Sequence, residues 1–466
     1  MYKAKIEKYA EDHKQEMLDD ICELCRINSE KMSYQEGMPF GEGPAKALRF
    51  ALEMADQYGF SISNYDNYVG TVDMNHEPKQ LDILAHLDVV PAGEGWVETQ
   101  PFEPVVKGDK LFGRGTADDK GPAIAALYAM RAVKELGIPL KKNVRLILGT
   151  DEECGSSDIA HYYANEEEAP MTFSPDGSFP VVNIEKGGLA GEFYQKWEKS
   201  EALPKVVSID AGIKINVVPG KAYAVVEGFD HKTLAAAMEK MTEKTGVEFK
   251  LDMEPVAEIT AIGAGAHAST PSEGNNALTA LLELLDSLPL APCAQKDAIH
   301  NLVELMPHGD TSGKALGINM EDELSGDLTL AFSLMKMTDA GFDASFDSRC
   351  PICSNEENVL KVVKEKMAAK GITLTNDHMK LPHHVSGDSD FVKTLLNAYE
   401  KYTGMKGECQ SMGGGTYVHN LKNGVAFGAS YPGTDNRMHG ADEFAVVSEL
   451  VACVKIFAQV IIDLCS

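Results

Sequence analysis

The chain has 466 residues, which is enough for more than one hydrophobic core, so two domains are expected. Its 43 basic and 71 acidic residues give a formal net charge of −28, and a field this negative repels phosphate backbones. The composition therefore excludes nucleic acid as a natural partner, while the hydrophobic content of 44% is ordinary for a globular protein.

In the first half of the chain, amphipathic segments alternate with short apolar runs that end in polar residues. The expected helices span 9–27, 41–60 and 121–137, and the expected strands lie within 81–90, 143–153 and 172–177. This alternation predicts the α/β class, a mostly parallel sheet with helices on both faces. Ligands bind such sheets beyond the carboxyl ends of the strands, which is where the polar residues cluster.

The middle of the chain, 183–381, has shorter strands with helices between them, which is typical of an α+β domain with two similar halves. After it, DFVKTLLNAYEKYTG and FAVVSELVACVKIFAQVIIDLC are expected to be helices that return to the first domain. The expected layout is one domain formed by 1–182 and 382–466, into which the α+β domain is inserted.

The N-terminal sequence MYKAKIEKYAEDHKQEM is charged throughout and lacks the apolar segment of a signal peptide. No stretch reaches the apolar length of a membrane-spanning helix. We therefore expect a cytoplasmic protein with no membrane partner.

Nine cysteines spread over a long chain do not suggest a disulfide framework. The pairs Cys22/Cys25 and Cys350/Cys353 both have C-x-x-C spacing and could together form a zinc ribbon. Because the first pair lies in a helical pattern and the pairs are far apart, reduced buried thiols are the favoured interpretation.

Histidine and carboxylate residues fall at the ends of the predicted strands. His86 and Asp88 lie two residues apart in AHLD, so both side chains face one side of an extended segment. The histidine can give a metal a neutral ring nitrogen while the acid orients a neighbouring group. Asp118 and Asp119 repel each other in GRGTADDKG, so a cation is a natural neutraliser, although either acid alone could simply cap the following helix.

TDEECGS places Glu152 and Glu153 at the end of another strand. Adjacent strand residues point apart, so one acid can bind a metal while the other handles a proton. Asp176 in SPDG and His439 in RMHGADEF would, taken singly, be a turn residue and a surface residue. Together, two histidines and several carboxylates suit zinc or manganese, and a bridging carboxylate suits a pair of ions.

Five segments in order, HLDVVPAGEGW, GRGTADDKGP, DEECGSSD, FSPDGSFP and HGADEF, resemble the signature regions of a family of di-zinc metallopeptidases. That family includes carnosinase, carboxypeptidase G, acetylornithine deacetylase and succinyl-diaminopimelate desuccinylase. FGEGPAKALRFALEMA and MGGGTY make the chain most similar to the PepV-type bacterial dipeptidases within it. The resemblance covers nearly the whole chain and implies a catalytic domain (1–182 and 382–466) with an inserted lid domain (183–381).

The resemblance implies two Zn²⁺ ions per chain, with Mn²⁺ or Co²⁺ as substitutes. In the family, the residue at the position of Asp119 follows a cis peptide bond. The implied roles are the bridging ligand (Asp118), the other ligands of one ion (His86 and Asp176), those of the second ion (Glu153 and His439), the general base (Glu152) and the acid that orients His86 (Asp88).

The resemblance extends to the inserted domain. In GAHASTP and INVVP it assigns His267 and Asn216 to the oxyanion, and in FDSR it assigns Arg349 to the C-terminal carboxylate of the substrate, which the planar guanidinium can hold by two hydrogen bonds. Without the resemblance, His267 would be an ordinary loop residue. Backbone N–H groups of four residues in MGGGTY would reach the same carboxylate: Gly413, Gly414, Gly415 and Thr416.

The implied activity is hydrolysis of dipeptides that carry a free amino group, including Xaa-His or β-Ala dipeptides. A metal-bridged hydroxide would attack the scissile carbonyl, with Glu152 as general base. An alternative within the family is an N-acyl amino acid amidohydrolase, that is, a deacylase or desuccinylase. A non-catalytic metal-binding protein is a third hypothesis, which the presence of Glu152 disfavours.

The inserted segment is nearly twice as long as the lid of many dimeric relatives in this family needs to be. Its second half could occupy the space that a partner's lid fills in those relatives. The expected assembly is therefore a monomer, with a homodimer as the alternative because symmetric dimers are common.

Overall fold

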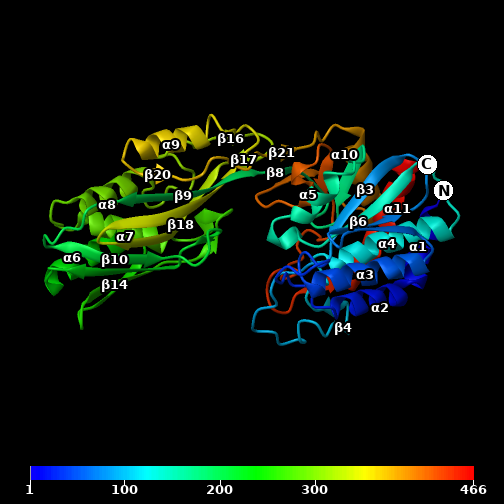
Figure 1. Cartoon of the computed structure of the whole chain (residues 1–466), viewed down its shortest axis with the longest axis horizontal. Coiled ribbons are helices and arrows are strands. Elements are labelled where there is room, and N and C mark those ends of the chain that lie inside the picture. Colours follow the sequence, from blue (N-terminus) through cyan, green and yellow to red (C-terminus); the bar gives the residue numbers. More distant parts are fainter. Residues whose placement is uncertain (1) are drawn as a thin grey trace. The chain divides into compact units, whose positions relative to one another are not determined.

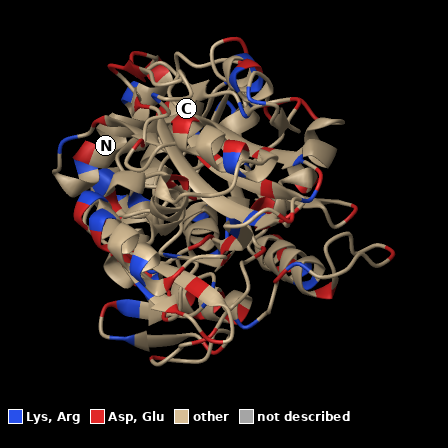
Figure 2. Cartoon of the chain, turned by 90° about the vertical axis from the view of Figure 1, so that its left-hand side faces the viewer, with Lys and Arg blue, Asp and Glu red and all other residues tan. Residues whose placement is uncertain are grey.

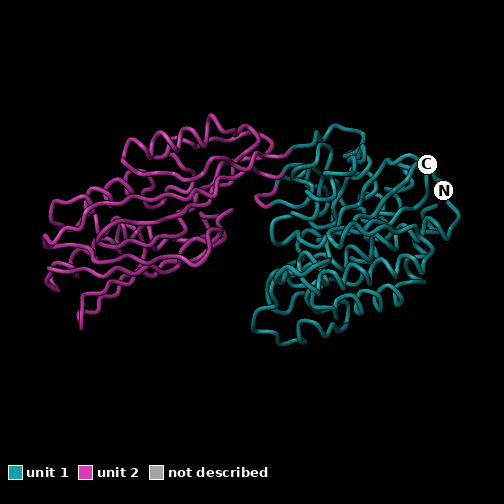
Figure 3. The backbone as a smooth tube through the Cα atoms, viewed as in Figure 1, with its two compact units in different colours: residues 1–184, 384–411, 415–466 teal, residues 185–383, 412–414 magenta. Residues whose placement is uncertain are grey.

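A computed structural model describes residues 2–466, which fall into two compact units (Figures 1 and 3). Of the described residues, unit 1 comprises 2–184, 384–411 and 415–466, and unit 2 comprises 185–383 and 412–414. Each unit has its own hydrophobic core. Over the described range, no helix is both long enough and apolar enough to cross a membrane.

The main sheet of unit 1 has nine strands in the order β1-β2-β6-β3-β7-β23-β8-β21, with β22 paired to β8. At its centre β3 runs parallel to β6 and β7, and β23 runs parallel to β7, whereas β1, β2 and β8 form antiparallel pairs towards the margins. The strands are β1 (Ser61–Tyr65), β2 (Val69–Asp73), β3 (Lys79–His86), β6 (Asn143–Gly149), β7 (Met171–Ser174), β8 (Val181–Glu185), β21 (His383–His384), β22 (Cys409–Met412) and β23 (Gly424–Ala426). The predicted α/β class is confirmed, with a mixed sheet whose centre is parallel.

Helices cover both faces of this sheet unequally (Figure 1). The larger core carries Val72, Ile83 and Leu146 against long helices, and the smaller core carries Leu84 and Ile147 against α5 and a short 3-10 turn. The alternation of strand residues between the two cores is the two-residue period of a sheet that is buried on both sides. The helices are α1 (Lys3–Asp12), α2 (Lys14–Cys25), α3 (Glu42–Gln57), α4 (Lys120–Glu135), α5 (Ser157–Tyr163), α10 (Asp390–Thr403) and α11 (Val447–Cys465), and the 3-10 turn is Tyr417–Asn420.

The single helix expected at 9–27 is wrong, because two helices, α1 and α2, meet at His13. Both the main-chain nitrogen and Nδ1 of His13 lie within 3.0 Å of the carbonyl oxygen of Tyr9, and the His13 ring stacks on the Tyr9 ring. The apolar period continues across this junction, so the sequence pattern did not indicate the break.

A small antiparallel sheet, β24-β5-β4, lies in unit 1 next to the segment that carries Asp118. Its strands are β4 (Val105–Lys107), β5 (Lys110–Phe112) and β24 (Phe444–Val446). In this sheet, β5, which precedes the GRGTADD segment, pairs with β24, which follows His439. The segments that carry Asp118 and His439 are therefore attached to the same small sheet.

Unit 2 is built on an eight-stranded sheet, ordered β13-β14-β12-β10-β18-β19-β9-β20, in which every neighbouring pair is antiparallel. Its helices and most of its buried strand residues form one large core, while Asp210, Tyr223 and Glu258 of the same strands remain exposed. The strands are β9 (Gly187–Lys196), β10 (Lys205–Ala211), β12 (Lys221–Glu227), β13 (Glu248–Asp252), β14 (Ala257–Ile262), β18 (Thr329–Thr338), β19 (Gly341–Cys350) and β20 (Thr373–Leu374), and the helices are α6 (His231–Thr245), α7 (Ala277–Ser287), α8 (Ala294–Leu305) and α9 (Leu360–Ala368). The α+β character expected of the inserted segment is confirmed.

Two short ribbons complete unit 2. One pairs β11 (Val217–Val218) with β15 (Ala266–His267), and the other pairs β16 (Glu321–Asp322) with β17 (Gly326–Asp327). Figure 2 shows acidic positions spread over helices and loops and interleaved with Lys and Arg, so the charge of −28 is distributed along the chain.

Candidate active site

The carboxyl ends of three parallel strands of unit 1 lie side by side. His86 is the last residue of β3 and is in register with Gly149, the last residue of β6, while β7 pairs along the other side of β3. Glu153 and Asp176 follow β6 and β7 respectively. The fold therefore gathers these residues at the end of the sheet where α/β proteins bind ligands.

Two groups of potential metal ligands occur among the described residues, and Asp118 belongs to both. In the first, Nε2 of His86 lies 3.0 Å from Oδ1 of Asp118 and 3.6 Å from Oδ2 of Asp176. In the second, Nε2 of His439 lies 3.0 Å from Oδ2 of Asp118 and 3.3 Å from Oε1 of Glu153. Each oxygen of the Asp118 carboxylate thus faces a different histidine, which is the arrangement of a bridging ligand.

The donor set fits a pair of divalent cations. Ligand atoms about 2.0–2.1 Å from a tetrahedral zinc ion lie roughly 3.3 Å from one another, close to the separations in both groups. Nε2 of His86 and Oε1 of Glu153 are buried and make no hydrogen bond, so each presents an unsatisfied lone pair. Leaving such atoms buried is costly unless a cation engages them.

The electrostatics of this region also favour positive charge. Burial lowers the pKa of His86, but the carboxylates of Asp118, Asp176 and Asp88 outweigh it and raise that pKa well above its ordinary value. The pKa of Glu152 is raised well above its ordinary value by burial and by the negative charge of Asp176, with Glu153 and Asp118 adding to the effect. Glu152 lies in neither ligand group. It is therefore a carboxyl group, close to other carboxylates, that can take up a proton.

The tautomer of His86 follows from its contact with Asp88. Nδ1 of His86 lies 3.0 Å from the main-chain oxygen of Asp88 and 3.5 Å from its Oδ1. Because a carbonyl oxygen only accepts hydrogen bonds, Nδ1 carries a proton, and Nε2 is the nitrogen that a metal ion would bind in place of a second proton. Asp88 thus contacts His86 mainly through its main-chain oxygen, and its carboxylate forms hydrogen bonds elsewhere.

The prediction that Glu152 and Glu153 lie on a strand end is wrong, because β6 stops at Gly149 and Glu152–Cys154 form a 3-10 turn. Oδ1 and Oδ2 of Asp88 accept hydrogen bonds from the backbone N–H groups of Glu152 and Glu153, both at 3.1 Å. Oδ2 of Asp158 accepts from the two preceding N–H groups at 2.6 and 2.9 Å. Two buried carboxylates therefore hold four consecutive N–H groups of this turn.

Asp158 is itself held by the hydroxyl of Tyr417, which donates a hydrogen bond to Oδ2. A side chain at Gly149 would collide with that hydroxyl, because an added Cβ would lie 2.1 Å from it. Asp158 and Tyr417 were not among the predicted site residues, although both lie within segments that carry the family resemblance, DEECGSSD and MGGGTY.

A third buried carboxylate, Glu443, holds the segment that carries Asp118. Oε1 of Glu443 accepts hydrogen bonds from the N–H groups of Gly115, Ala117 and Asp118 at 3.0, 3.0 and 3.2 Å, and Oε2 accepts one from Nη1 of Arg114 at 2.6 Å. Both side chains of the ion pair are at most 1% exposed. The peptide bond between Asp118 and Asp119 is cis, as in the family that the sequence resembles.

Several residues assigned to substrate binding lie together in unit 2. Val217, next to Asn216, is paired with His267 in the β11–β15 ribbon, and the N–H of Ala268 donates to the carbonyl of Asn216 at 2.9 Å. Nδ1 of His267 lies 2.6 Å from Oγ of Ser269. Burial and the nearby Arg349 lower the pKa of His267, which favours its neutral form.

Arg349 has a fixed orientation in the same unit. Its Nε and Nη2 donate to the two oxygens of Asp347 at 2.9 and 2.7 Å, and its Nη1 donates to the carbonyl of Gly413 at 2.6 Å. A guanidinium has five N–H bonds, so two remain for another acceptor. Asp347 is buried and was not singled out by sequence analysis, although it lies two residues before Arg349 in FDSR.

The four residues of the MGGGTY segment do not fall in one unit. Gly413 and Gly414 belong to unit 2, whereas Gly415 and Thr416 belong to unit 1. The Thr416 hydroxyl accepts a hydrogen bond from the N–H of Val418 and caps the 3-10 turn Tyr417–Asn420.

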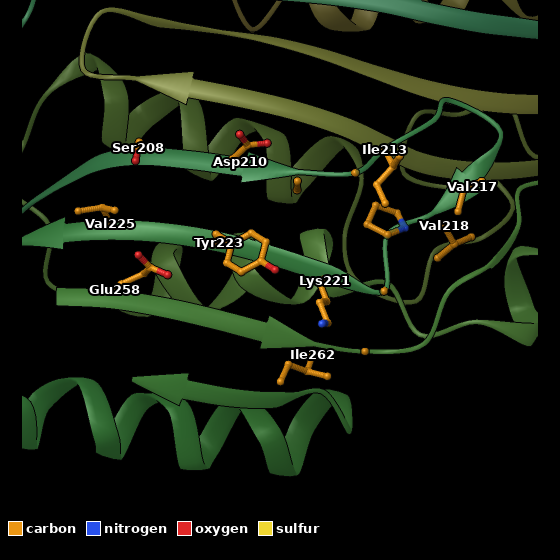
Figure 4. A pocket seen from close by; sticks show the side chains of 15 residues that line it. Ser208, Asp210, Ile213, Val217, Val218, Lys221, Tyr223, Val225, Glu258 and Ile262 are labelled. Carbon is orange, nitrogen blue, oxygen red and sulfur yellow. The ribbon is translucent and has the colours of Figure 1, made fainter. Parts of the chain in front are cut away.

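Two of the cavities in unit 2 have nearly equal volumes. One, of 700 Å³, is lined by Asn216, Asp347 and Arg349 among others. The other, of 680 Å³, lies where Asp210, Tyr223 and Glu258 project from β10, β12 and β14 (Figure 4). The second cavity contains no residue that sequence analysis assigned to the site.

The α/β sheet with paired His and carboxylate groups at its strand ends, next to an acid outside both groups, defines a metal-dependent hydrolase. The model of the peptidase family M20/M25/M40 matches residues 83–463, which is more than half of the chain. The protein therefore belongs to this family of metallopeptidases.

Similarities in sequence and in fold to named proteins support this assignment. The chain is 35% identical over 464 residues to the Beta-Ala-Xaa dipeptidase of Lactobacillus delbrueckii subsp. lactis, with 98% of each chain covered. Human carnosine dipeptidase 1 has a similar fold, with a TM-score of 0.60 and 14% identity over 100% of this chain and 99% of that one. The di-peptidase Dug1p of Saccharomyces cerevisiae is also similar in fold, with a TM-score of 0.58 and 14% identity over 98% of both chains.

Proposed function

We propose that this protein is a dipeptidase that hydrolyses the peptide bond of dipeptides carrying a free amino group, with Glu152 as general base. The observation that carries the proposal is the pair of ligand groups sharing Asp118, beside a Glu152 that belongs to neither. The full-length similarity to a Beta-Ala-Xaa dipeptidase supports the choice of substrate class.

We propose that two divalent cations, Zn²⁺ by preference and Mn²⁺ or Co²⁺ as substitutes, occupy the two ligand groups. His86 and Asp176 would hold one ion, Glu153 and His439 the other, and Asp118 would bridge them. Bound cations of this kind lower the pKa of water towards ~7 and polarise the scissile carbonyl.

Glu152 carries the proton in both proton-transfer steps of the proposed reaction. Its carboxylate removes a proton from the attacking water as the new C–O bond forms, and delivers that proton to the departing amine as the C–N bond breaks. Its raised pKa suits both steps, because the group must hold the proton between them. The Asp88 carboxylate keeps Glu152 in position through the backbone.

In this proposal, substrate recognition falls mainly to residues of unit 2, with Gly415 and Thr416 contributed by unit 1. His267 and Asn216 donate hydrogen bonds to the oxyanion that develops on the carbonyl. Arg349, held by Asp347 and the carbonyl of Gly413, uses its two remaining N–H bonds for the C-terminal carboxylate of the substrate, and the backbone N–H groups of Gly413, Gly414, Gly415 and Thr416 bind the same carboxylate. β-Ala-Xaa and Xaa-His dipeptides are candidate substrates.

We infer that the protein acts as a monomer. The eight-stranded sheet of unit 2 is made by one chain, with β10 paired to β18 at its centre, so it needs no strand from a partner. Mixing inactive Glu152→Gln chains with inactive His267→Ala chains tests this inference. Restored activity would show that His267 works across a subunit boundary and would favour the homodimer.

A substrate panel tests the function. Dipeptides, tripeptides and N-acetyl amino acids would be assayed with added Zn²⁺, Mn²⁺ or Co²⁺. The proposal expects turnover of dipeptides only. Preference for N-acetyl amino acids would instead support an amidohydrolase, and metal binding without turnover of any compound would support a non-catalytic metal-binding protein.

A further inference from the structure

Ser269 makes two contacts with the ring of His267. The N–H of Ser269 donates to Nδ1 of His267 at 3.2 Å, and its Oγ lies 2.6 Å from the same atom. The N–H of Thr270 donates to the carbonyl of His267 at 3.0 Å, so His267–Thr270 form a tight turn. Ser269 therefore faces the ring from a position that the turn fixes.

These contacts settle which ring nitrogen of His267 carries the proton. A backbone N–H can only donate, so Nδ1 must accept and the proton of the neutral ring must lie on Nε2. The opposite tautomer would place the Nδ1 proton against the N–H of Ser269. The serine hydroxyl, at 2.6 Å, supplies a second donor to the same lone pair.

The surroundings keep this arrangement intact. Ala268, between the two residues, is fully buried, and its N–H is bound to Asn216, so the backbone of the turn is anchored. A side chain at Gly413 would meet Ser269, because an added Cβ would lie 3.0 Å from the Ser269 Cβ. Glycine at 413 therefore leaves room for the serine.

We propose that Ser269 is a positioning residue that fixes the Nε2–H tautomer of His267 and so presents that proton as the donor to the oxyanion. The inference rests on the role proposed above for His267 and adds the group that makes it a donor. Without the serine hydroxyl, only the longer backbone contact at 3.2 Å opposes the Nδ1–H form, in which Nε2 is an acceptor and would repel an oxyanion.

The tautomer can be measured directly by ¹⁵N NMR on the full chain labelled at histidine. The His267 signals are assigned by comparison with the His267→Gln variant. The proposal expects an unprotonated Nδ1 and a protonated Nε2 at about pH 7 in the wild type. In Ser269→Ala, which keeps the backbone donor but loses the shorter hydroxyl contact, it expects a measurable shift towards the Nδ1–H form. A protonated Nδ1 in the wild type, or an unchanged tautomer in Ser269→Ala, would overturn it.

Kinetics supply the second readout. A single oxyanion donor is worth about 10²–10³ in kcat, so its partial loss in Ser269→Ala should lower kcat roughly 10-fold with little change in KM. Ser269→Thr keeps the hydroxyl and should restore both the tautomer and kcat. Ser272 is exposed in the following turn, so Ser272→Ala is the matched control and should behave as the wild type.

The outcomes separate this proposal from the one on which it rests. A large loss of kcat in His267→Ala combined with wild-type kcat in Ser269→Ala would refute the role of Ser269 alone. Wild-type kcat in His267→Ala would remove the oxyanion role of His267, and with it the catalytic consequence of the tautomer.

Discussion

The Glu443→Ala substitution removes a buried carboxylate on which the guanidinium of Arg114 and three backbone N–H groups converge. Leaving one partner of a buried ion pair without the other costs about 3–5 kcal/mol. Each orphaned N–H adds about 1 kcal/mol or more. A domain has a total stability of only about 5–15 kcal/mol, so we expect unit 1 to be severely destabilised.

The effect should also reach the metal centre, because one of the three N–H groups belongs to Asp118. Urea unfolding of the metal-free protein measures the first effect, and metal content after dialysis against a weak chelator measures the second. Glu443→Gln keeps an oxygen for the N–H groups but turns an amide towards Arg114, so its loss should be smaller, about 1–3 kcal/mol.

A double variant provides the control. In Arg114→Met with Glu443→Leu, both charges are removed, and the buried pair is replaced by apolar side chains of similar volume. This variant should unfold at a higher urea concentration than Glu443→Ala. If Glu443→Ala had the unfolding midpoint and the metal content of the wild type, the inference that Glu443 holds the Asp118 segment would be refuted.

Three further predictions follow from the same geometry. Asp118→Ala should lose both metal equivalents on dialysis against a weak chelator, whereas His86→Ala should lose mainly one; a full complement in Asp118→Ala would show that the bridge is misassigned. Arg349→Ala should raise KM for dipeptides by roughly 10–100-fold, the worth of hydrogen bonds to a charged group, but should leave KM for dipeptide amides nearly unchanged; an equal rise for both substrates would refute carboxylate recognition. Burial raises the pKa of Asp82 from 3.8 to about 7. Between about pH 4 and 7, Asp82 therefore stays protonated in the folded protein but ionises in the unfolded chain. Its contribution to the free energy of unfolding falls over this range and stays low above it. Asp82→Asn should therefore stabilise the protein by about 2–4 kcal/mol at pH 8 but by much less near pH 4, as measured by urea unfolding at both values; the same gain at both would contradict the shift.

The sequence pattern predicted the elements that supply His86 and Asp176, because buried parallel strands are apolar runs that end where the chain leaves the core. The parallel pairing of β3 with β6 and β7 then explains why residues far apart in sequence meet. The family resemblance added roles that single residues could not indicate, above all for His439, which is half-exposed and would otherwise look like a surface residue.

What the pattern could not predict depends on partners from distant segments. The turn at Glu152 is stabilised because the carboxylates of Asp88 and Asp158 accept hydrogen bonds from its N–H groups. An apolar run that ends in acidic residues does not predict these hydrogen bonds. The buried pair of Arg114 and Glu443 joins residues separated by 329 positions, and charged residues in loops are usually exposed. Such contacts are properties of the fold and not of any local period.

Activity and metal content of the Glu152→Gln variant, measured on one sample, test the proposed mechanism most directly. Glutamine keeps the shape of Glu152 but cannot accept the proton, and Glu152 belongs to neither ligand group. The expected result is a loss of at least about 10²–10⁴-fold in kcat with both metal equivalents retained. Near-normal turnover, or the loss of one metal equivalent, would contradict the assignment of Glu152 as the general base.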